Sequence, residues 1–175
     1  MSETRWDVEI RPGEKISLNG TIESVYAQLL ELNPNYEADN AEQISARLAK
    51  LEEETAAAQG KQLAKRDHTE CWRLRPQISG SAIEGGIRYL WRVGGDAWIQ
   101  GGTCSRASCS WNLAIGWCSY RAGGEWWMSP GGFPWIGHAA NVVANDRGNQ
   151  QGSLTVNGQR YHDSHVAVTV DQGYC

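Results

Sequence analysis

The sequence has no apolar run of about 18 residues, the length that a membrane-spanning helix needs. It also has no excess of basic residues, because its formal net charge is −4. A general attraction to nucleic acid or to anionic lipid is therefore not expected. We predict a protein with no membrane span and no nucleic-acid partner.

Cysteine is missing from residues 1–66, and lysine is missing from residues 67–175. The second segment holds all five cysteines, eight of the nine tryptophans and seventeen of the twenty glycines. Such different compositions indicate two segments selected for different environments. Cysteines confined to one segment are typical of an oxidising destination. We therefore expect a secreted protein whose signal peptide is absent from this sequence.

The first segment is predicted to form a small hairpin followed by two helices. Apolar and polar residues alternate over residues 6–18 on both sides of a Pro-Gly turn. Apolar residues then recur at helical spacing over 22–32 and again over 44–51. Asp39 and Glu42 have the spacing of a capping box before the second helix. A unit this small is marginal by itself, so we expect it to lean on the rest of the chain.

The two segments meet at Lys65-Arg66, the only pair of adjacent basic residues. We predict that a kexin-type processing protease cleaves after Arg66, which divides the chain into a removable leader, residues 1–66, and a mature domain, residues 67–175. The alternative is an ordinary solvated basic turn. The leader also contains the glycosylation sequon Asn19-Gly20-Thr21, which has meaning only in a secreted chain.

The second segment is organised around residues 104–118, which hold three of the five cysteines. Residues alternate from Ala107 onward with the period of a half-buried strand, so we predict one central strand here. On such a strand Cys109 and Cys118 point to opposite faces, so we expect that they do not share a partner strand. The disulfide candidates form two bridges at most, in an arrangement that the sequence leaves open; they are Cys71, Cys104, Cys109, Cys118 and Cys175.

Two helices and further strands are predicted around this strand. A capping-box pattern and an apolar stripe indicate a helix over residues 81–91, in which Gly85-Gly86 indicates close packing or a short helix. Pro134 suits the start of a second helix. Residues 125–128 suit a paired strand, and Asn157-Gly158 predicts a hairpin turn before a return strand at 166–170. The predicted fold class is α+β: a small disulfide-stapled antiparallel sheet with two helices on one face, preceded by the leader.

Several motifs together resemble a family of small secreted proteins of filamentous ascomycete fungi. They are Trp6–Tyr26 with Leu32-Asn33-Pro34, Gly85–Leu90, Cys104–Cys118, Val156–His162 and the final Cys175. The resemblance implies a signal peptide, a leader, a Lys-Arg processing site and a cysteine-bearing mature part in an effector candidate of no settled enzymatic activity. It also implies three disulfides. This chain departs from the pattern, because residues 143–146 lack the cysteine that relatives carry there.

The catalytic residue types do not form a motif that predicts an enzyme. Tyr161–His165 is the only cluster of such types, and its two histidines face opposite sides of a strand unless a turn brings them together. Ser129 and His138 lack a nucleophile-elbow pattern. An unpaired cysteine would need a base beside it to act as a nucleophile. We predict no catalysis, no metal and no cofactor.

The tryptophans are the remaining candidates for function. Trp126, Trp127 and Trp135 are candidate ligand contacts in a stacking platform for sugar rings, and His162 is a further candidate contact. The interpretation that we favour is that tryptophan fills a small core. Because neighbours on a strand point to opposite faces, we expect at most one of Trp126 and Trp127 to be exposed.

We therefore predict a secreted effector-like proprotein whose mature domain binds an unknown host or competitor molecule, in the host apoplast or inside a host cell. One alternative is a cell-wall glycan-binding module that uses exposed tryptophan. The other is a secreted toxin or antimicrobial protein, although the neutral charge of residues 67–175 argues against action on membranes.

Overall fold

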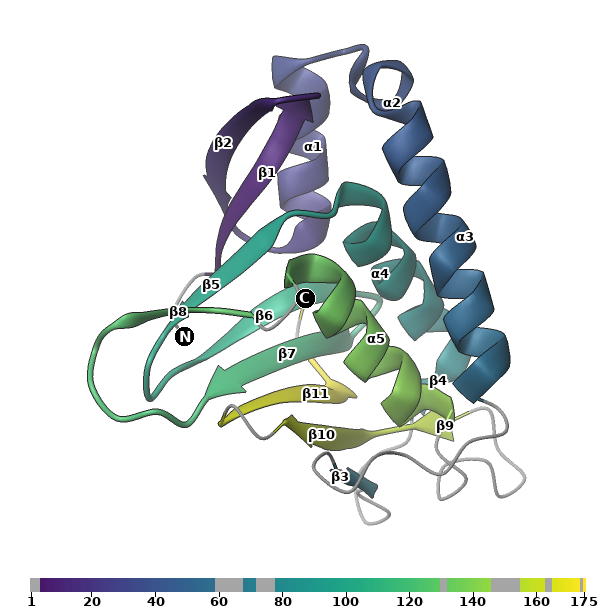
Figure 1. Cartoon of the computed structure of the whole chain (residues 1–175). Coiled ribbons are helices and arrows are strands. Elements are labelled where there is room, and N and C mark those ends of the chain that lie inside the picture. Colours follow the sequence, from purple (N-terminus) through teal and green to yellow (C-terminus); the bar gives the residue numbers. More distant parts are fainter. Residues whose placement is uncertain are drawn as a thin grey trace.

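The structure is a computed structural model that describes residues 4–58, 68–71, 78–129, 132–145, 155–162, 165–173 and 175. It shows an α+β protein with helices and antiparallel sheets, which confirms the predicted fold class (Figure 1). Within those ranges, no helix has the length and apolar character that crossing a membrane requires.

The first sheet joins the N-terminal part of the chain to its middle. Its strands are β1 (Arg5–Arg11), β2 (Glu14–Asn19), β5 (Asp96–Gln100) and β8 (Trp126–Met128), in the order β2-β1-β5-β8. Strands β1 and β2 are the predicted hairpin, and β8 is the predicted paired strand. Strand β5 pairs antiparallel with β1, so the sheet contains residues from both sides of the predicted boundary at Arg66.

The second sheet contains the cysteine-rich strands. Its order is β3-β10-β11-β7-β6, and the strands are β3 (His68–Cys71), β6 (Cys104–Ser110), β7 (Leu113–Ser119), β10 (Gly158–His162) and β11 (Val166–Gln172). Strands β4 (Ile78–Ser79) and β9 (Thr155–Val156) form a separate pair. Helix α4 (Gly80–Val93) packs on β6 and β7, and helix α5 (Gly132–Asn145) packs on β10 and β11, so both cover this sheet (Figure 1).

The stretch from Cys104 to Cys118 forms two strands, β6 and β7, where the alternation predicts one. The turn between them is Trp111-Asn112, whose φ angles of 52° and 60° are those of a two-residue type I′ hairpin turn. The prediction was wrong because Trp is an unusual residue for such a turn. Trp111 therefore lies at the tip of the hairpin with 89% of its surface exposed, outside the core.

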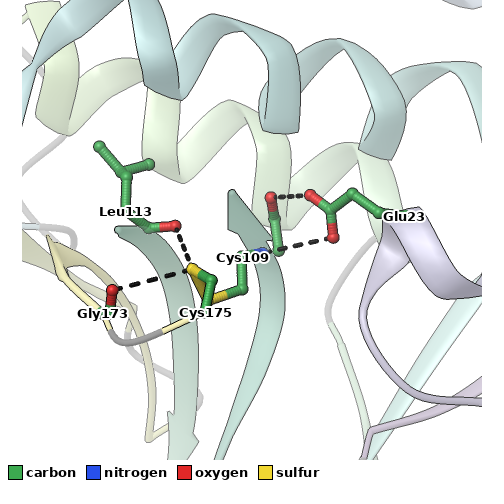
Figure 2. The surroundings of a disulfide bond; sticks show 6 residues. Glu23, Cys109, Leu113, Gly173 and Cys175 are labelled. Atoms are coloured by element: carbon green, nitrogen blue, oxygen red, sulfur yellow. Dashed lines mark hydrogen bonds between the residues drawn. A yellow bond between two sulfur atoms is a disulfide. The ribbon is translucent and has the colours of Figure 1, made fainter. Parts of the chain in front are cut away.

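Because of this hairpin, two cysteines lie on other faces of the sheet than a single strand predicts. Cys109 lies opposite Ala114, and Ala114 shares a face with Cys118, so Cys109 and Cys118 lie on the same face and not on opposite ones. They still do not share a partner strand, because Cys104 lies in β6 and Cys175 lies in no strand. Cys118 forms a disulfide with Cys104, directly across the hairpin, and Cys109 forms one with Cys175 (Figure 2).

The remaining cysteine is Cys71. Its backbone lies in β3, opposite Gly158 of β10. Because the two disulfides use the other four cysteines, no cysteine of the chain is left to pair with it. The two disulfides are the largest number that five cysteines allow, and the third bridge that the resemblance implies does not form within the chain.

The hairpin predicted at Asn157-Gly158 is also wrong. These residues lead from β9 into β10, and the return strand β11 pairs with β10 from His162 opposite Val166 onward. The reversal of direction therefore comes between residues 162 and 166. His165, one of its residues, has a φ of 64°. An Asn-Gly pair favours a turn, but here the sheet continues through Gly158, which pairs on both sides.

The N-terminal helices are α1 (Ile22–Leu32), α2 (Tyr36–Asp39) and α3 (Ala41–Ala58). Helices α1 and α3 are the two predicted ones, and α2 is a short turn that the sequence did not predict. Helix α3 begins one residue later than predicted, because Asn40 takes the place of Asp39 before its first turn: the N–H of Ile44 donates to the carbonyl of Asn40. Asp39 ends α2 instead of capping α3.

Helix α4 lies unusually close to the second sheet. A Cβ atom at Gly86 would stand 2.4 Å from the Oγ of Ser108 and 3.1 Å from a methyl carbon of Ile115. No side chain fits there unless the side chains of Ser108 and Ile115 shift. The close packing expected at Gly85-Gly86 is therefore found at Gly86.

One hydrophobic core contains residues from both parts of the chain. Trp6 and Leu29 belong to the same buried cluster as Leu90 and Trp117, and the Trp6 ring centroid lies 3.9 Å from that of Phe133. Among the described residues the chain therefore has one shared core. Cleavage after Arg66 stays a prediction, because Lys65 and Arg66 lie outside the described residues.

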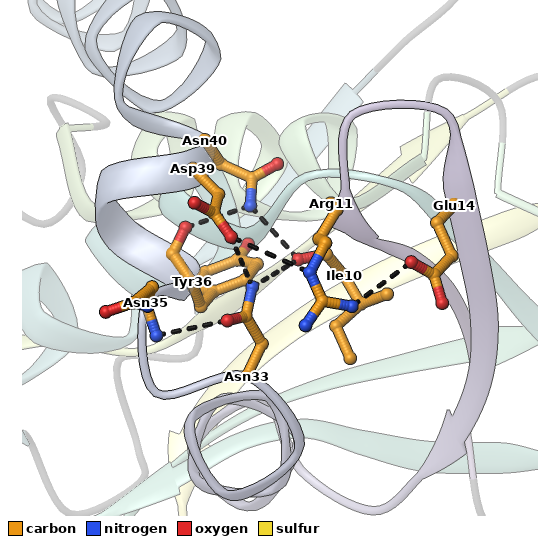
Figure 3. Close-up of polar contacts among 8 residues, drawn as sticks. All are labelled: Ile10, Arg11, Glu14, Asn33, Asn35, Tyr36, Asp39 and Asn40. Carbon is orange, nitrogen blue, oxygen red and sulfur yellow. Dashed lines mark hydrogen bonds and ion pairs between the residues drawn. The ribbon is translucent and has the colours of Figure 1, made fainter.

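Two buried asparagines join the hairpin to the helices (Figure 3). The pairing of β1 with β2 is irregular between Glu9 and Arg11. The carbonyl of Ile10, in this irregular stretch, accepts hydrogen bonds from the side-chain amides of Asn33, at 3.1 Å, and Asn40, at 3.2 Å. The sequence places both amides next to helix ends, where they satisfy a backbone group that would otherwise be costly to bury.

Candidate functional site

The candidate site is the outer face of the first sheet. Trp6, Val8 and Ile10 of β1 point into the core, as do Ala97 and Ile99 of β5. The alternate residues of the strands therefore lie on the other side, which we call the outer face. Its members are Arg5, Asp7, Glu9, Lys15, Ser17, Asn19, Asp96, Trp98, Gln100, Trp126 and Met128.

One end of the outer face is an aromatic cluster of Arg5, Trp98, Trp126 and Met128. The guanidinium carbon of Arg5 lies 4.9 Å from the Trp98 ring centroid and 5.2 Å from the Trp126 ring centroid. Both distances are within the range of cation–π attraction, so Arg5 orders the two indoles. Trp126 is 42% exposed and Met128, which lies directly opposite Trp98, is 48% exposed. The cluster therefore presents apolar surface to solvent.

A pair of facing carboxylates lies next to this cluster. Asp7 of β1 is directly opposite Asp96 of β5, and like charges in that position destabilise a sheet. The Ser17 hydroxyl donates to Oδ1 of Asp7 at 2.5 Å. Arg5 Nη2 lies 3.7 Å from the other oxygen of Asp7, and Lys15 Nζ lies 4.0 Å from Asp96. These partners offset part of the repulsion.

The carboxylates border a polar pocket of about 190 Å³. It opens beyond Asp7, where the pairing between β1 and β5 ends. Its lining residues are Asp7, Glu9, Lys15, Tyr36, Asn40, Arg47, Val93, Gly95 and Asp96. Tyr36 and Asn40 are buried and form the floor, whereas Lys15 is exposed at the rim.

Burial shifts the pKa of two groups that line the pocket. It raises the pKa of Tyr36 to about 12 and lowers the pKa of Arg47. Arg47 nevertheless has good partners, because its Nε donates to the carbonyl of Trp91 at 2.9 Å and its Nη2 to that of Arg92 at 2.7 Å. Its charge thus lies at the C-terminal end of α4, where the helix dipole favours a cation.

The structure places the predicted aromatic residues in different parts of the molecule. Trp126 lies on the outer face, but Trp127 lies on the opposite face of β8, with the guanidinium carbon of Arg121 3.9 Å from its ring centroid. Trp135 packs against the core and meets His162 edge to face at 5.4 Å. As expected, only one of these two neighbours is exposed: Trp126 is exposed, and Trp127 is partly buried. The single platform of three tryptophans does not form.

The other residues considered for chemistry have structural partners. The hydroxyl of Ser129 is buried and donates to the carbonyl of Gly132. His138 Nδ1 lies 2.8 Å from a carboxylate oxygen of Glu54. In the described part of the chain, no group of three or more His, Cys, Asp or Glu side chains is placed to hold a metal ion. Residues 163 and 164 of the histidine cluster lie outside the described residues.

The sequence reasoning missed Arg5, Asp7, Asp96 and Trp98. The alternation over residues 5–10 and 96–100 identifies each as a residue on the polar side of a strand. Nothing local shows that β1 and β5 are neighbours, since 84 or more residues separate them along the chain. Their pairing is what brings Arg5 opposite Trp98. No known protein family, curated protein or solved structure matches this chain.

Proposed function

We propose that this protein is a secreted, effector-like binding protein that takes a carbohydrate on its outer face. The observation that supports this most is Arg5 lying between Trp98 and Trp126, beside two carboxylates that face each other. Indole faces stack on the C–H faces of sugar rings, and ionised carboxylates accept hydrogen bonds from sugar hydroxyls. An exposed apolar patch with polar groups at its edge is typical of a binding surface.

Under this proposal, both pieces that the predicted processing produces contribute to the binding surface. Arg5 and Asp7 come from residues 1–66, whereas Asp96, Trp98 and Trp126 come from residues 67–175. The outer face is complete only while the two parts are together. Cleavage after Arg66 by a kexin-type protease therefore yields two pieces that stay associated through the shared sheet and core. The two disulfides suit an oxidising, extracellular destination such as the host apoplast.

A binding screen against soluble oligosaccharides tests the proposal. Trp126→Ala is expected to weaken binding of the best ligand about tenfold, which corresponds to about 1.4 kcal/mol. Trp111→Ala is the matched control, because Trp111 is exposed at the tip of the β6–β7 hairpin, away from the outer face. The control is expected to bind like the unmodified protein.

Two outcomes contradict the proposal. One is that no oligosaccharide binds, while a host protein is the partner that the protein recognises. The other is that Trp111→Ala weakens binding as much as Trp126→Ala. Either result would show that the ligand binds away from the outer face or that it belongs to another chemical class.

A further inference from the structure

We propose that the ligand of the outer face carries a primary amine, and that the polar pocket beside Asp7 and Asp96 takes this group. The inference rests on the proposed carbohydrate function and makes it more specific: the ligand is an oligosaccharide of amino sugars.

The charges in the pocket favour a cation. Three carboxylates line it, from Asp7, Glu9 and Asp96, against two basic side chains. Of these two, Arg47 donates hydrogen bonds to backbone carbonyls at the C-terminal end of α4. The helix dipole there already stabilises its positive charge. Lys15 is 60% exposed and stands 4.0 Å from Asp96, the long limit of an ion pair. Asp7 also has Arg5 at 3.7 Å, but Arg5 does not line the pocket. Among the lining side chains the carboxylates still outnumber the basic groups, so a further positive group is favoured over an acidic sugar.

The pocket also offers an acceptor in its floor. Tyr36 is 1% exposed, and its hydroxyl donates to the carbonyl of Val93 over a long distance of 3.5 Å. The lone pairs of this oxygen receive no hydrogen bond from the described residues. An ammonium group has three donors and no acceptor, which suits a buried hydroxyl oxygen and the carboxylates above it.

The size of the pocket suits one sugar ring. A cavity of about 150 Å³ holds benzene in another protein, and this pocket has about 190 Å³. Asp7 is two residues from Arg5 on β1, and Asp96 is two residues from Trp98 on β5, so the carboxylates and the aromatic cluster are about 7 Å apart along the strands. One short oligosaccharide therefore reaches both.

The test compares oligomers of equal length and the same linkage built from glucosamine, from N-acetylglucosamine and from glucose. Calorimetric titration of the whole chain is expected to give at least about tenfold tighter binding for the glucosamine oligomer at low salt. Asp96→Asn and Glu9→Gln are each expected to reduce this preference, measured as the ratio of the two affinities, at least about threefold.

Glu84→Gln is the matched control. Glu84 is exposed on α4 and lies nine residues before Val93, so it is about 13 Å along the helix from the pocket. This variant is expected to keep the full preference. Equal affinity for the three oligomers overturns the inference, as does an unchanged preference in both Asp96→Asn and Glu9→Gln. A lysine oligopeptide that binds the pocket more tightly than the glucosamine oligomer also overturns it.

Free glucosamine separates a failure of this inference from a failure of the proposed function. Nuclear magnetic resonance is expected to show shifts of the backbone amides of Glu9, Gly95 and Asp96 on its addition. If these shifts occur but no oligosaccharide binds, the carbohydrate function is wrong and the amine pocket remains. If neutral oligomers bind but glucosamine causes no shifts, the amine pocket is wrong and the carbohydrate function remains.

Discussion

The carboxylate of Glu23, in helix α1, accepts a hydrogen bond from the hydroxyl of Ser108, in strand β6 (Figure 2). The other oxygen of Glu23 accepts one from the backbone N–H of Cys109 at 3.3 Å. Strand β6 is at the edge of the second sheet, where unpaired backbone groups invite pairing with another chain. Glu23 therefore binds one backbone N–H of this edge strand and joins the N-terminal part of the chain to the disulfide-bonded hairpin.

Removing the Glu23 carboxylate is expected to destabilise the whole protein. Glu23→Ala leaves the buried hydroxyl of Ser108 and the N–H of Cys109 without their partner, which costs about 2 to 3 kcal/mol of the free energy of unfolding. Denaturant unfolding measures the loss. Glu31→Ala is the matched control, because Glu31 is exposed on the same helix. Equal losses in the two variants would contradict the role given to Glu23.

The two disulfides are expected to differ in their contribution to stability. Cys109–Cys175 closes a loop with a sequence separation of 66, whereas Cys104–Cys118 has a separation of 14. The entropy of loop closure predicts stabilisation of about 4 kcal/mol for the first and about 3 kcal/mol for the second. Urea unfolding of the two paired Cys→Ala variants checks this order. A larger loss on removing Cys104–Cys118 would show that the loop-entropy account fails here.

Stability is expected to fall at alkaline pH because of Tyr36. Its pKa is raised to about 12 in the folded protein, and an unfolded tyrosine ionises near 10. Between these values the unfolded chain loses a proton that the folded chain keeps, so the free energy of unfolding decreases as the pH rises, by about 2 to 3 kcal/mol in all. Below pH 10 the raised pKa of Tyr36 contributes its full stabilisation, and above pH 12 no further free energy of unfolding is lost from this group.

The Tyr36→Phe variant isolates this effect. Its free energy of unfolding is expected to change less between pH 10 and 12 than that of the parent protein. Both proteins should carry Cys71→Ser, because a thiolate formed at alkaline pH attacks disulfides. Parallel pH profiles for the two proteins would refute the assignment to Tyr36.

Glycosylation of Asn19 is expected to weaken ligand binding. Asn19 ends β2 directly opposite Arg5, on the outer face, and its side chain is exposed. A glycan attached there lies over the strands that lead to Trp98. Protein secreted by a eukaryotic host and carrying this glycan should bind oligosaccharide less tightly than the Asn19→Gln variant made in the same host. Equal affinities would place the binding surface away from β2.

The local structure of this chain could largely be predicted from its sequence. The hairpin at 6–18, both long N-terminal helices and the helices around 83–91 and 134–143 follow from periodicity and capping, and all are present. Local patterns were misleading where a turn used an unfavoured residue. Trp111 continued the alternation so well that two strands looked like one, although Trp111-Asn112 is the turn.

The candidate site could not be predicted, because it depends on strand pairing between distant segments. The sequence identified Trp126 only as one of three candidate tryptophans, and its neighbours Trp98 and Arg5 come from β5 and β1. The composition break near residue 66 also suggested two separate units. The shared core follows from the apolar faces of β1 and α1 meeting α4, which no local signal specifies.

The most direct test of the binding surface is to follow the indole N–H resonances of all tryptophans while the protein is titrated with an oligosaccharide. Single Trp→Phe variants assign the resonances. The account predicts that Trp98 and Trp126 shift together with a common dissociation constant, while Trp111 and Trp135 stay unchanged. Shifts of Trp111 or Trp135, with Trp98 and Trp126 unchanged, would contradict it.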